Sequence, residues 1–94
     1  MKTIHKYPID MGGTRLQIHQ GYQIIKVDNQ GEKNPCFWAI VDTDKPKEER
    51  SFIVLGTGSA FLPGMQYVGT WQEPPFVWHL FDISEIKLMR AHDN

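Results

Sequence analysis

Short runs of strand-forming residues, separated by turn-forming residues, follow one another along most of the chain. Residues 14–19 (TRLQIH) alternate apolar and polar positions, which is typical of a strand with one face in solvent. The runs 22–27 (YQIIKV) and 35–42 (PCFWAIVD) flank the polar segment DNQGEKN, and this arrangement predicts a β-hairpin with a long tip. Because CFWAIV is apolar at every position, we expect this strand to be buried on both faces or to lie at a subunit contact.

Further strands are predicted toward both ends of the chain. Residues 2–9 form the first strand, and residues 51–56 form another. Residues 66–72 and 76–82 predict a final antiparallel pair, because two consecutive prolines interrupt the ladder between them. The spacing of all these strands predicts an all-β, mainly antiparallel fold, which is a sandwich or small barrel of six or seven strands with a short C-terminal helix.

Two segments depart from the strand pattern. Residues 42–50 (DTDKPKEER) hold seven charged residues in nine and a central proline, so we expect a solvated loop, with room for a helical turn after Pro46. After the last strand the apolar spacing becomes helical, and Ser84 is a candidate N-cap. The chain is therefore divided into a single β domain, residues 1–82, and a short C-terminal helix or tail, residues 83–94.

Length, charge and cysteine content narrow the class of protein. The chain has 94 residues, 40% of them hydrophobic, and this length supports a single core. Domains of this size are marginally stable, so we expect a homo-oligomer. The formal net charge of −1 and the mixed signs provide no clustered basic surface, which argues against nucleic acid as a partner. The single Cys36 and the absence of a long apolar segment predict a cytoplasmic protein that does not enter the membrane.

The glycine-rich segment GTGSAFLPG (56–64) is the first candidate site. It lacks the lysine of a phosphate-binding P-loop, and its match to a dinucleotide-binding fingerprint stops after the second glycine. Two interpretations stay open. Small residues could admit a ligand or another chain to the backbone, with the Thr57 hydroxyl as a donor and Gly58 beside it. Alternatively, the segment is a bulge and turn whose Phe61 and Leu62 point into the core.

Histidine, cysteine and carboxylate residues provide little catalytic signal. The four histidines are far apart and form no paired ligand motif, so we expect no metal and no cofactor. His79 lies inside an apolar strand, where it is either a buried histidine satisfied by a backbone carbonyl or a ligand-binding or acid–base residue. Cys36 opens an apolar strand and is expected to be an inert thiol. Because the paired carboxylates lie in the charged segment, the sequence contains no convincing catalytic set, and we expect a protein that is not an enzyme.

Aromatic residues occur on nearly every predicted strand, and most of them must fill the core. Trp71, at a strand end beside polar residues and prolines, is a candidate stacking platform for a base or anchor in a protein interface. The basic residues of the charged segment could supply anion contacts beside it or could simply be solvated. These residues define two hypothetical sites: a ligand site of Arg50, Thr57, Gly58, Trp71 and His79, and a protein-binding site of Lys45, Lys47 and Trp71.

Five stretches of the sequence are familiar as a set: MKTIHKYPI, PCFWAIVD, PKEERSFIVLGTG, YVGTWQ and FVWHLFD. Together they resemble a family of small uncharacterised proteins of tailed phages and prophages, a domain of unknown function. The resemblance covers residues 1–82. It implies a bacterial host cytoplasm and a short accessory gene of the kind that acts against the host, and it supplies no catalytic or binding residues.

The resemblance and the lack of a catalytic set lead to a functional hypothesis. We expect a non-enzymatic, phage- or prophage-encoded binding protein that counteracts host defence by binding a defence protein. The alternatives are a sponge that sequesters a nucleotide immune signal at the hypothetical ligand site, a small hydrolase of such a signal, and a structural component of the virion. A sponge would need enclosed polar and cationic groups that balance the phosphate charge.

Overall fold

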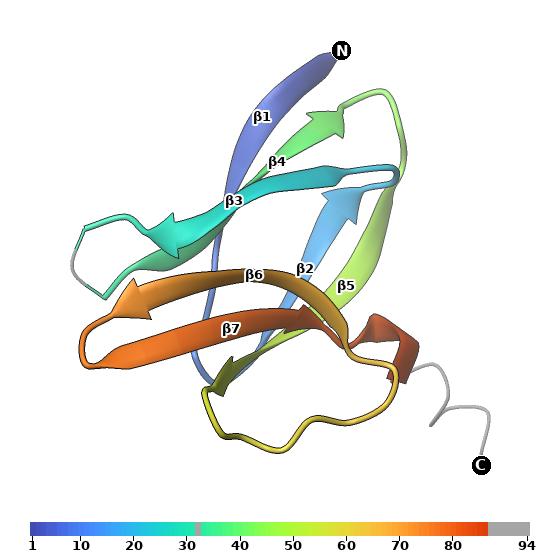
Figure 1. The fold of residues 1–94 in the computed structure, drawn as a ribbon. Coiled ribbons are helices and arrows are strands. Elements are labelled where there is room, and N and C mark those ends of the chain that lie inside the picture. The colour runs from blue at the N-terminus through green and yellow to red at the C-terminus, as the bar shows by residue number, and fades with distance from the viewer. Residues whose placement is uncertain (32, 87–94) are drawn as a thin grey trace.

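Seven β-strands form two antiparallel sheets in the computed structural model, which describes residues 1–31 and 33–86 (Figure 1). The three-stranded sheet has the order β1 (Lys2–Pro8), β4 (Pro35–Asp42), β3 (Gln23–Asn29). The four-stranded sheet has the order β2 (Thr14–His19), β5 (Lys47–Gly56), β7 (Phe76–Asp82), β6 (Gln66–Glu73). The prediction of a mainly antiparallel sandwich is confirmed, with seven strands. The barrel alternative is wrong, because the described strands form two separate sheets and do not close.

The core lies between the two sheets and is built by alternate residues of central and edge strands. In β4, which lies between β1 and β3, Phe37, Ala39 and Val41 are fully buried. The residues that alternate with them, Trp38 and Ile40, are only half-buried. The expected burial of β4 on both faces therefore holds for one face. The four-stranded sheet contributes the buried side chains of Ile18, Phe52, Trp71 and Leu80.

The two sheets approach each other most closely where β3 packs against β6 (Figure 1). Gly69 lies in β6 next to a register shift in the pairing with β7. A Cβ atom on Gly69 would lie 2.6 Å from Cγ2 of Val27 in β3. Only glycine allows the strands to pack this closely without displacing the valine, so Gly69 sets the spacing of the sheets at this point.

The charged segment 42–50 corrects the sequence-based expectation. Only residues 43–46 form a turn, which the Lys45 N–H closes by donating to the Asp42 carbonyl at 3.0 Å. β5 begins at Lys47, which is opposite His19 of β2. The prediction of a solvated loop to residue 50, with a helical turn after Pro46, is therefore wrong. Antiparallel pairing with β2 satisfies the backbone of this segment, and charged side chains are compatible with a strand that has exposed positions.

The chain after β7 is attached to β5 by specific hydrogen bonds. The Ile83 N–H donates to the Ser51 carbonyl at 2.8 Å, and the Ser51 N–H donates to Oγ of Ser84 at 2.9 Å. Residues 84–86 are helical, as predicted for the start of the C-terminal helix. The rest of the predicted helix, residues 87–94, lies outside the described residues.

Candidate functional site

Three residues of the hypothetical ligand site, Thr57, Gly58 and His79, come together where β5 ends beside β7. Oγ1 of Thr57 lies 3.1 Å from Nε2 of His79, and Oγ1 of Thr70 lies 2.9 Å from Nδ1 of the same ring. These contacts form a hydrogen-bonded chain of side chains, which the Tyr67 hydroxyl extends with a contact of 2.7 Å to Oγ1 of Thr70. Gly58 adopts φ +93°, a conformation that glycine favours, in the turn that follows Thr57. Sequence reasoning placed Thr57 and His79 in the same hypothetical site and missed Thr70 and Tyr67.

The hydrogen bonds of His79 differ from those of a buried histidine satisfied by a backbone carbonyl. The ring is half-buried, and its two nitrogens contact hydroxyl groups instead of a backbone carbonyl. Hydroxyls can donate or accept, so they hold the ring in one orientation whichever nitrogen carries the proton. A hydroxyl beside an imidazole is also part of the arrangement that activates nucleophiles. Thr57 lies on an exposed turn, and the hydrogen bonds from Tyr67 through Thr70 and His79 to Thr57 link polar side chains of β5, β6 and β7.

Apolar side chains surround this hydrogen-bonded chain on the outward surface of the four-stranded sheet. The strand register places Ile53 and Tyr67 on either side of Phe81. The ring centroids of Phe61 and Tyr67 lie 5.3 Å and 5.8 Å from that of Phe81, in edge-on packing. We call this surface the aromatic face and define it by six residues: Ile53, Leu55, Phe61, Tyr67, Val77 and Phe81.

Much of the aromatic face is open to solvent. Tyr67 is 64% exposed, Phe61 is 58% exposed, and the neighbouring Leu62 is 51% exposed. The expectation that Phe61 and Leu62 point into the core is therefore wrong. The core between the sheets is filled by strand residues, and the segment that carries Phe61 instead lies against the outward side of β7. The signal for this surface was present in β7, where Phe81 alternates with the buried Leu80, so that both faces of the strand are apolar.

A cavity of about 480 Å³ lies next to the hydrogen-bonded chain and shares Thr57 with it. Phe76 and Trp78 form part of its wall, with stacked rings whose centroids are 5.3 Å apart. Gly56 allows Trp78 to lie against the backbone, because a Cβ atom there would be 3.1 Å from the indole ring. The arrangement offers a flat aromatic surface beside one hydroxyl group.

Arg50, the predicted cation of the ligand site, has a structural contact instead. Its guanidinium donates to Oδ2 of Asp82 from Nε at 3.1 Å and from Nη2 at 2.7 Å, and the Tyr22 hydroxyl donates to the same oxygen at 3.3 Å. The Asp82 side chain is only 7% exposed. Burial by itself would raise the pKa of Asp82, but hydrogen bonds from Ser84 and Arg50 outweigh it and lower the pKa. The ion pair joins β5 to the end of β7 and lies apart from Thr57.

The remaining predicted residues also lie apart from the hydrogen-bonded chain. Trp71 is 3% exposed and belongs to the core, so its ring has no exposed face for stacking on a base or anchoring a partner. Its position opposite Trp78 places it on the inward side of the sheet, toward β3. Lys45 and Lys47 are exposed, in the turn before β5 and at its first residue. The structure therefore does not bring Lys45, Lys47 and Trp71 together as one surface site.

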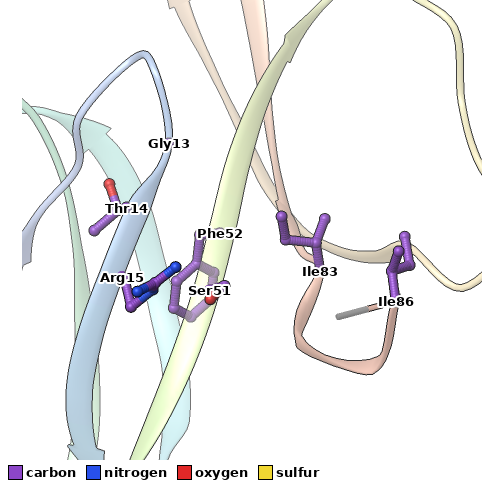
Figure 2. Close-up of a pocket in the computed structure, with 7 residues that line it drawn as sticks. All are labelled: Gly13, Thr14, Arg15, Ser51, Phe52, Ile83 and Ile86. Atoms are coloured by element: carbon purple, nitrogen blue, oxygen red, sulfur yellow. The ribbon is translucent and has the colours of Figure 1, made fainter. Parts of the chain in front are cut away.

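Another cavity, of about 510 Å³, opens between the start of β2, the middle of β5 and the segment after β7. Figure 2 shows its lining residues, with Phe52, Ile83 and Ile86 as the apolar groups and Arg15 as the charged group. Nε of Arg15 lies 3.6 Å from a carboxylate oxygen of Glu49, so the charge of this cation already has a partner. None of the predicted site residues lines this cavity.

The described part of the chain contains no group of three or more histidine, cysteine or acidic residues that could hold a metal ion. Cys36 is buried, and its thiol donates to the Asn34 carbonyl at 3.4 Å. Within residues 1–31 and 33–86, no helix has the length and apolar character needed to cross a membrane.

The fold and this surface define a small β-sandwich with an open aromatic face on one sheet. Residues 1–88 match a domain of unknown function, DUF7352, and the chain belongs to that family. The match extends past Asp82 and includes Ile83 and Ser84, the residues that are hydrogen-bonded to β5. No curated protein and no solved structure is significantly similar to the chain.

Proposed function

We propose that this protein is a non-enzymatic binding protein that engages another protein through its aromatic face. The observation that carries the proposal is the exposure of Phe61 and Tyr67, which pack against Phe81 and form a continuous surface with it. Interface cores are enriched in tyrosine and phenylalanine and depleted of charged residues. The six residues of the aromatic face carry no charge. The hydroxyls of Thr57 and Thr70 beside it are hydrogen-bonding groups that would orient a bound partner.

The proposed partner is a bacterial defence protein. The choice of a defence protein as the partner is supported by the resemblance to small phage and prophage proteins. The same resemblance supports the proposed location in the host cytoplasm. In this proposal the protein covers a surface of its target and thereby counteracts host defence. Self-association remains a separate prediction, which sedimentation or size-exclusion chromatography with light scattering would check.

The test compares two variants during purification from bacterial cells that carry active defence systems. The double variant Phe61→Ser/Tyr67→Ser removes the exposed part of the aromatic face. The matched control is Ile4→Ser, since Ile4 is also apolar and 56% exposed but lies on β1 of the other sheet. We expect a stoichiometric host protein to co-purify with the parent and the control, and the double variant to bind that purified protein at least roughly 30-fold more weakly in calorimetry.

Host defence that stays active in cells with the double variant, but is suppressed in cells with the parent or the control, would support the anti-defence role. Retention of the partner by the double variant would refute the aromatic face as the binding surface. A partner unrelated to defence would refute the finer proposal and leave the surface assignment standing.

A second candidate function is sequestration of a nucleotide signal. The observation that favours it is the cavity at Thr57, whose wall includes the stacked rings of Phe76 and Trp78. Aromatic faces of this kind stack on nucleobases. In the same purification, an intact nucleotide released on denaturation would support this candidate, and chemical turnover of an added nucleotide would support the hydrolase alternative.

A further inference from the structure

The hairpin of β6 and β7 carries a row of four side chains that begins in the core and ends at the hairpin tip, on the left in Figure 1. Trp71 and Trp78 are directly opposite each other, and Glu73 and Phe76 are the last opposite pair before the tip. Opposite residues of an antiparallel pair, and residues two apart along a strand, point to the same face of a sheet. Because Trp71 belongs to the core, all four side chains lie on the inward face of the hairpin.

Burial decreases along this row toward the hairpin tip. Trp71 is fully enclosed, Trp78 is half-buried, and Phe76 is 55% exposed. The rings of Phe76 and Trp78 are stacked, with an angle of 26° between their planes. Both rings also form part of the wall of the cavity at Thr57. The aromatic surface of the hairpin therefore extends beyond the core and is open to solvent at Phe76.

The indole ring of Trp78 is held in place from two neighbouring strands. Its six-membered ring lies against Gly56 of β5, where a Cβ atom would be only 3.1 Å from the ring. Its Nε1–H donates to Oε2 of Glu73 in β6 at 3.2 Å. The hydrogen bond also fixes the carboxylate of Glu73, which is half-buried, at the edge of the ring. The carboxylate and the two rings are thus positioned before any ligand binds.

The negative charge of Glu73 has no cationic partner among the described residues, none of which forms an ion pair with it. The indole N–H is a neutral donor and leaves this charge in place. The last described residue, Ile86, lies close to Gly64, at the opposite end of the β6–β7 pair. The faces of aromatic rings are also negative, because of their quadrupole. The hairpin tip therefore combines a fixed carboxylate with two electron-rich rings.

We propose that the tip of this hairpin binds an arginine side chain of another polypeptide. A guanidinium group pairs with a carboxylate, stacks flat on aromatic rings and is more weakly hydrated than the ammonium group of lysine. The guanidinium lies beside Glu73 and against the rings of Phe76 and Trp78, and the aliphatic stem runs toward the cavity at Thr57. The site is independent of the aromatic face, because Phe76 and Trp78 alternate with Val77 and point to the other side of the sheet.

The experiment is an NMR titration of the full chain that follows the indole N–H signal of Trp78. The probes are N-acetyl-arginine amide and the lysine and citrulline compounds with the same blocked ends, since citrulline keeps the planar shape of arginine without its charge. We expect the arginine probe to cause a saturable shift with a dissociation constant on the order of 1 mM, as suits so small a ligand. The lysine probe should bind at least about threefold more weakly, and the citrulline probe should cause no saturable shift.

Two variants test which groups carry the binding. Glu73→Gln keeps an oxygen that accepts from the indole N–H but removes the charge, and it should weaken binding of the arginine probe at least about fivefold. Phe76→Leu keeps an apolar side chain but removes the ring, and it should also weaken binding. The matched control is Glu48→Gln, which removes the charge of another half-buried glutamate at the start of β5 and should leave binding unchanged. Thermal unfolding checks that each variant is folded.

Several outcomes would overturn the proposal. They are the absence of a saturable shift with the arginine probe, equal binding of the lysine or citrulline probe, and unchanged binding by Glu73→Gln. A loss of binding by the Glu48→Gln control equal to that of Glu73→Gln would also overturn it. AMP is titrated in parallel, and tighter binding of AMP than of the arginine probe at the Trp78 signal would assign this surface to a nucleotide instead.

Discussion

Replacement of Gly69 by alanine tests whether the close packing of β6 against β3 determines how the sheets are spaced. The added Cβ would lie 2.6 Å from Cγ2 and 3.0 Å from Cβ of Val27. Ordinary carbon–carbon contacts are about 3.5–4.0 Å, so one of the strands must move by roughly 1 Å. Val27 has little freedom to rotate away, because its side chain is β-branched and packs against the core.

The expected magnitude is the balance of two opposing effects. Glycine within a strand costs about 0.5–1 kcal/mol relative to alanine, and Gly69 has no positive φ that would penalise a side chain. Overpacking of a core costs about 1–3 kcal/mol, and the contact of 2.6 Å is severe enough to place the cost in the upper half of that range. We therefore expect Gly69→Ala to reduce the free energy of unfolding by about 1–2 kcal/mol.

The assay is urea unfolding followed by tryptophan fluorescence, with a double-mutant cycle through Val27→Ala. The valine variant by itself should also be destabilised, because it removes buried methyl groups. The combined variant should recover stability, with a coupling energy of at least about 1 kcal/mol in favour of the pair. A neutral or stabilising Gly69→Ala, or additive effects of the two substitutions, would show that the sheets have room to separate and that this reasoning is incorrect.

Three further predictions concern single residues. Asp82→Asn should cost about 3 kcal/mol, because it leaves Arg50 without its buried partner. The folded state lowers the pKa of Asp82, so the stability that the ionised carboxylate provides is complete above the unfolded pKa of about 3.9 and is lost as the pH falls through the folded pKa. The Asp82→Asn variant should therefore lose less stability than the parent in acid denaturation. Gly58→Ala should lower the melting temperature by roughly 4–8 °C, because alanine strains a backbone at φ +93°. Because Gly58 is not part of the aromatic face, the variant should bind the partner protein as the parent does. Thr70→Val should free one ring nitrogen of His79 and shift the imidazole signals in NMR spectra, whereas unchanged signals would contradict the hydrogen bond.

Alternation and turn chemistry were sufficient to locate most of the strands. The runs 14–19, 35–42 and 76–82 were predicted within the bounds that the structure has, because each is flanked by turn residues or prolines. The start of β5 at Lys47 was missed, since the exposed positions of a paired strand accept charged side chains that local patterns assign to loops.

The candidate site was predictable only in part, for a related reason. Thr57 and His79 could be singled out by residue type, but their contact depends on the pairing of β5 with β7, which brings together residues 22 positions apart. Arg50 was recognised as a cation, and only the packed structure showed Asp82 as its partner.

The sequence by itself determined the fold class, because periodicity along a strand and the positions of glycine and proline are local properties of the chain. Tertiary structure decided which apolar residues are core and which are surface. Trp71 and Phe61 are both large and aromatic, yet one is 3% exposed and the other 58%. Hydrophobicity gives each of them the same tendency toward burial, and only the packing of the second sheet determines which side of a strand the core can occupy.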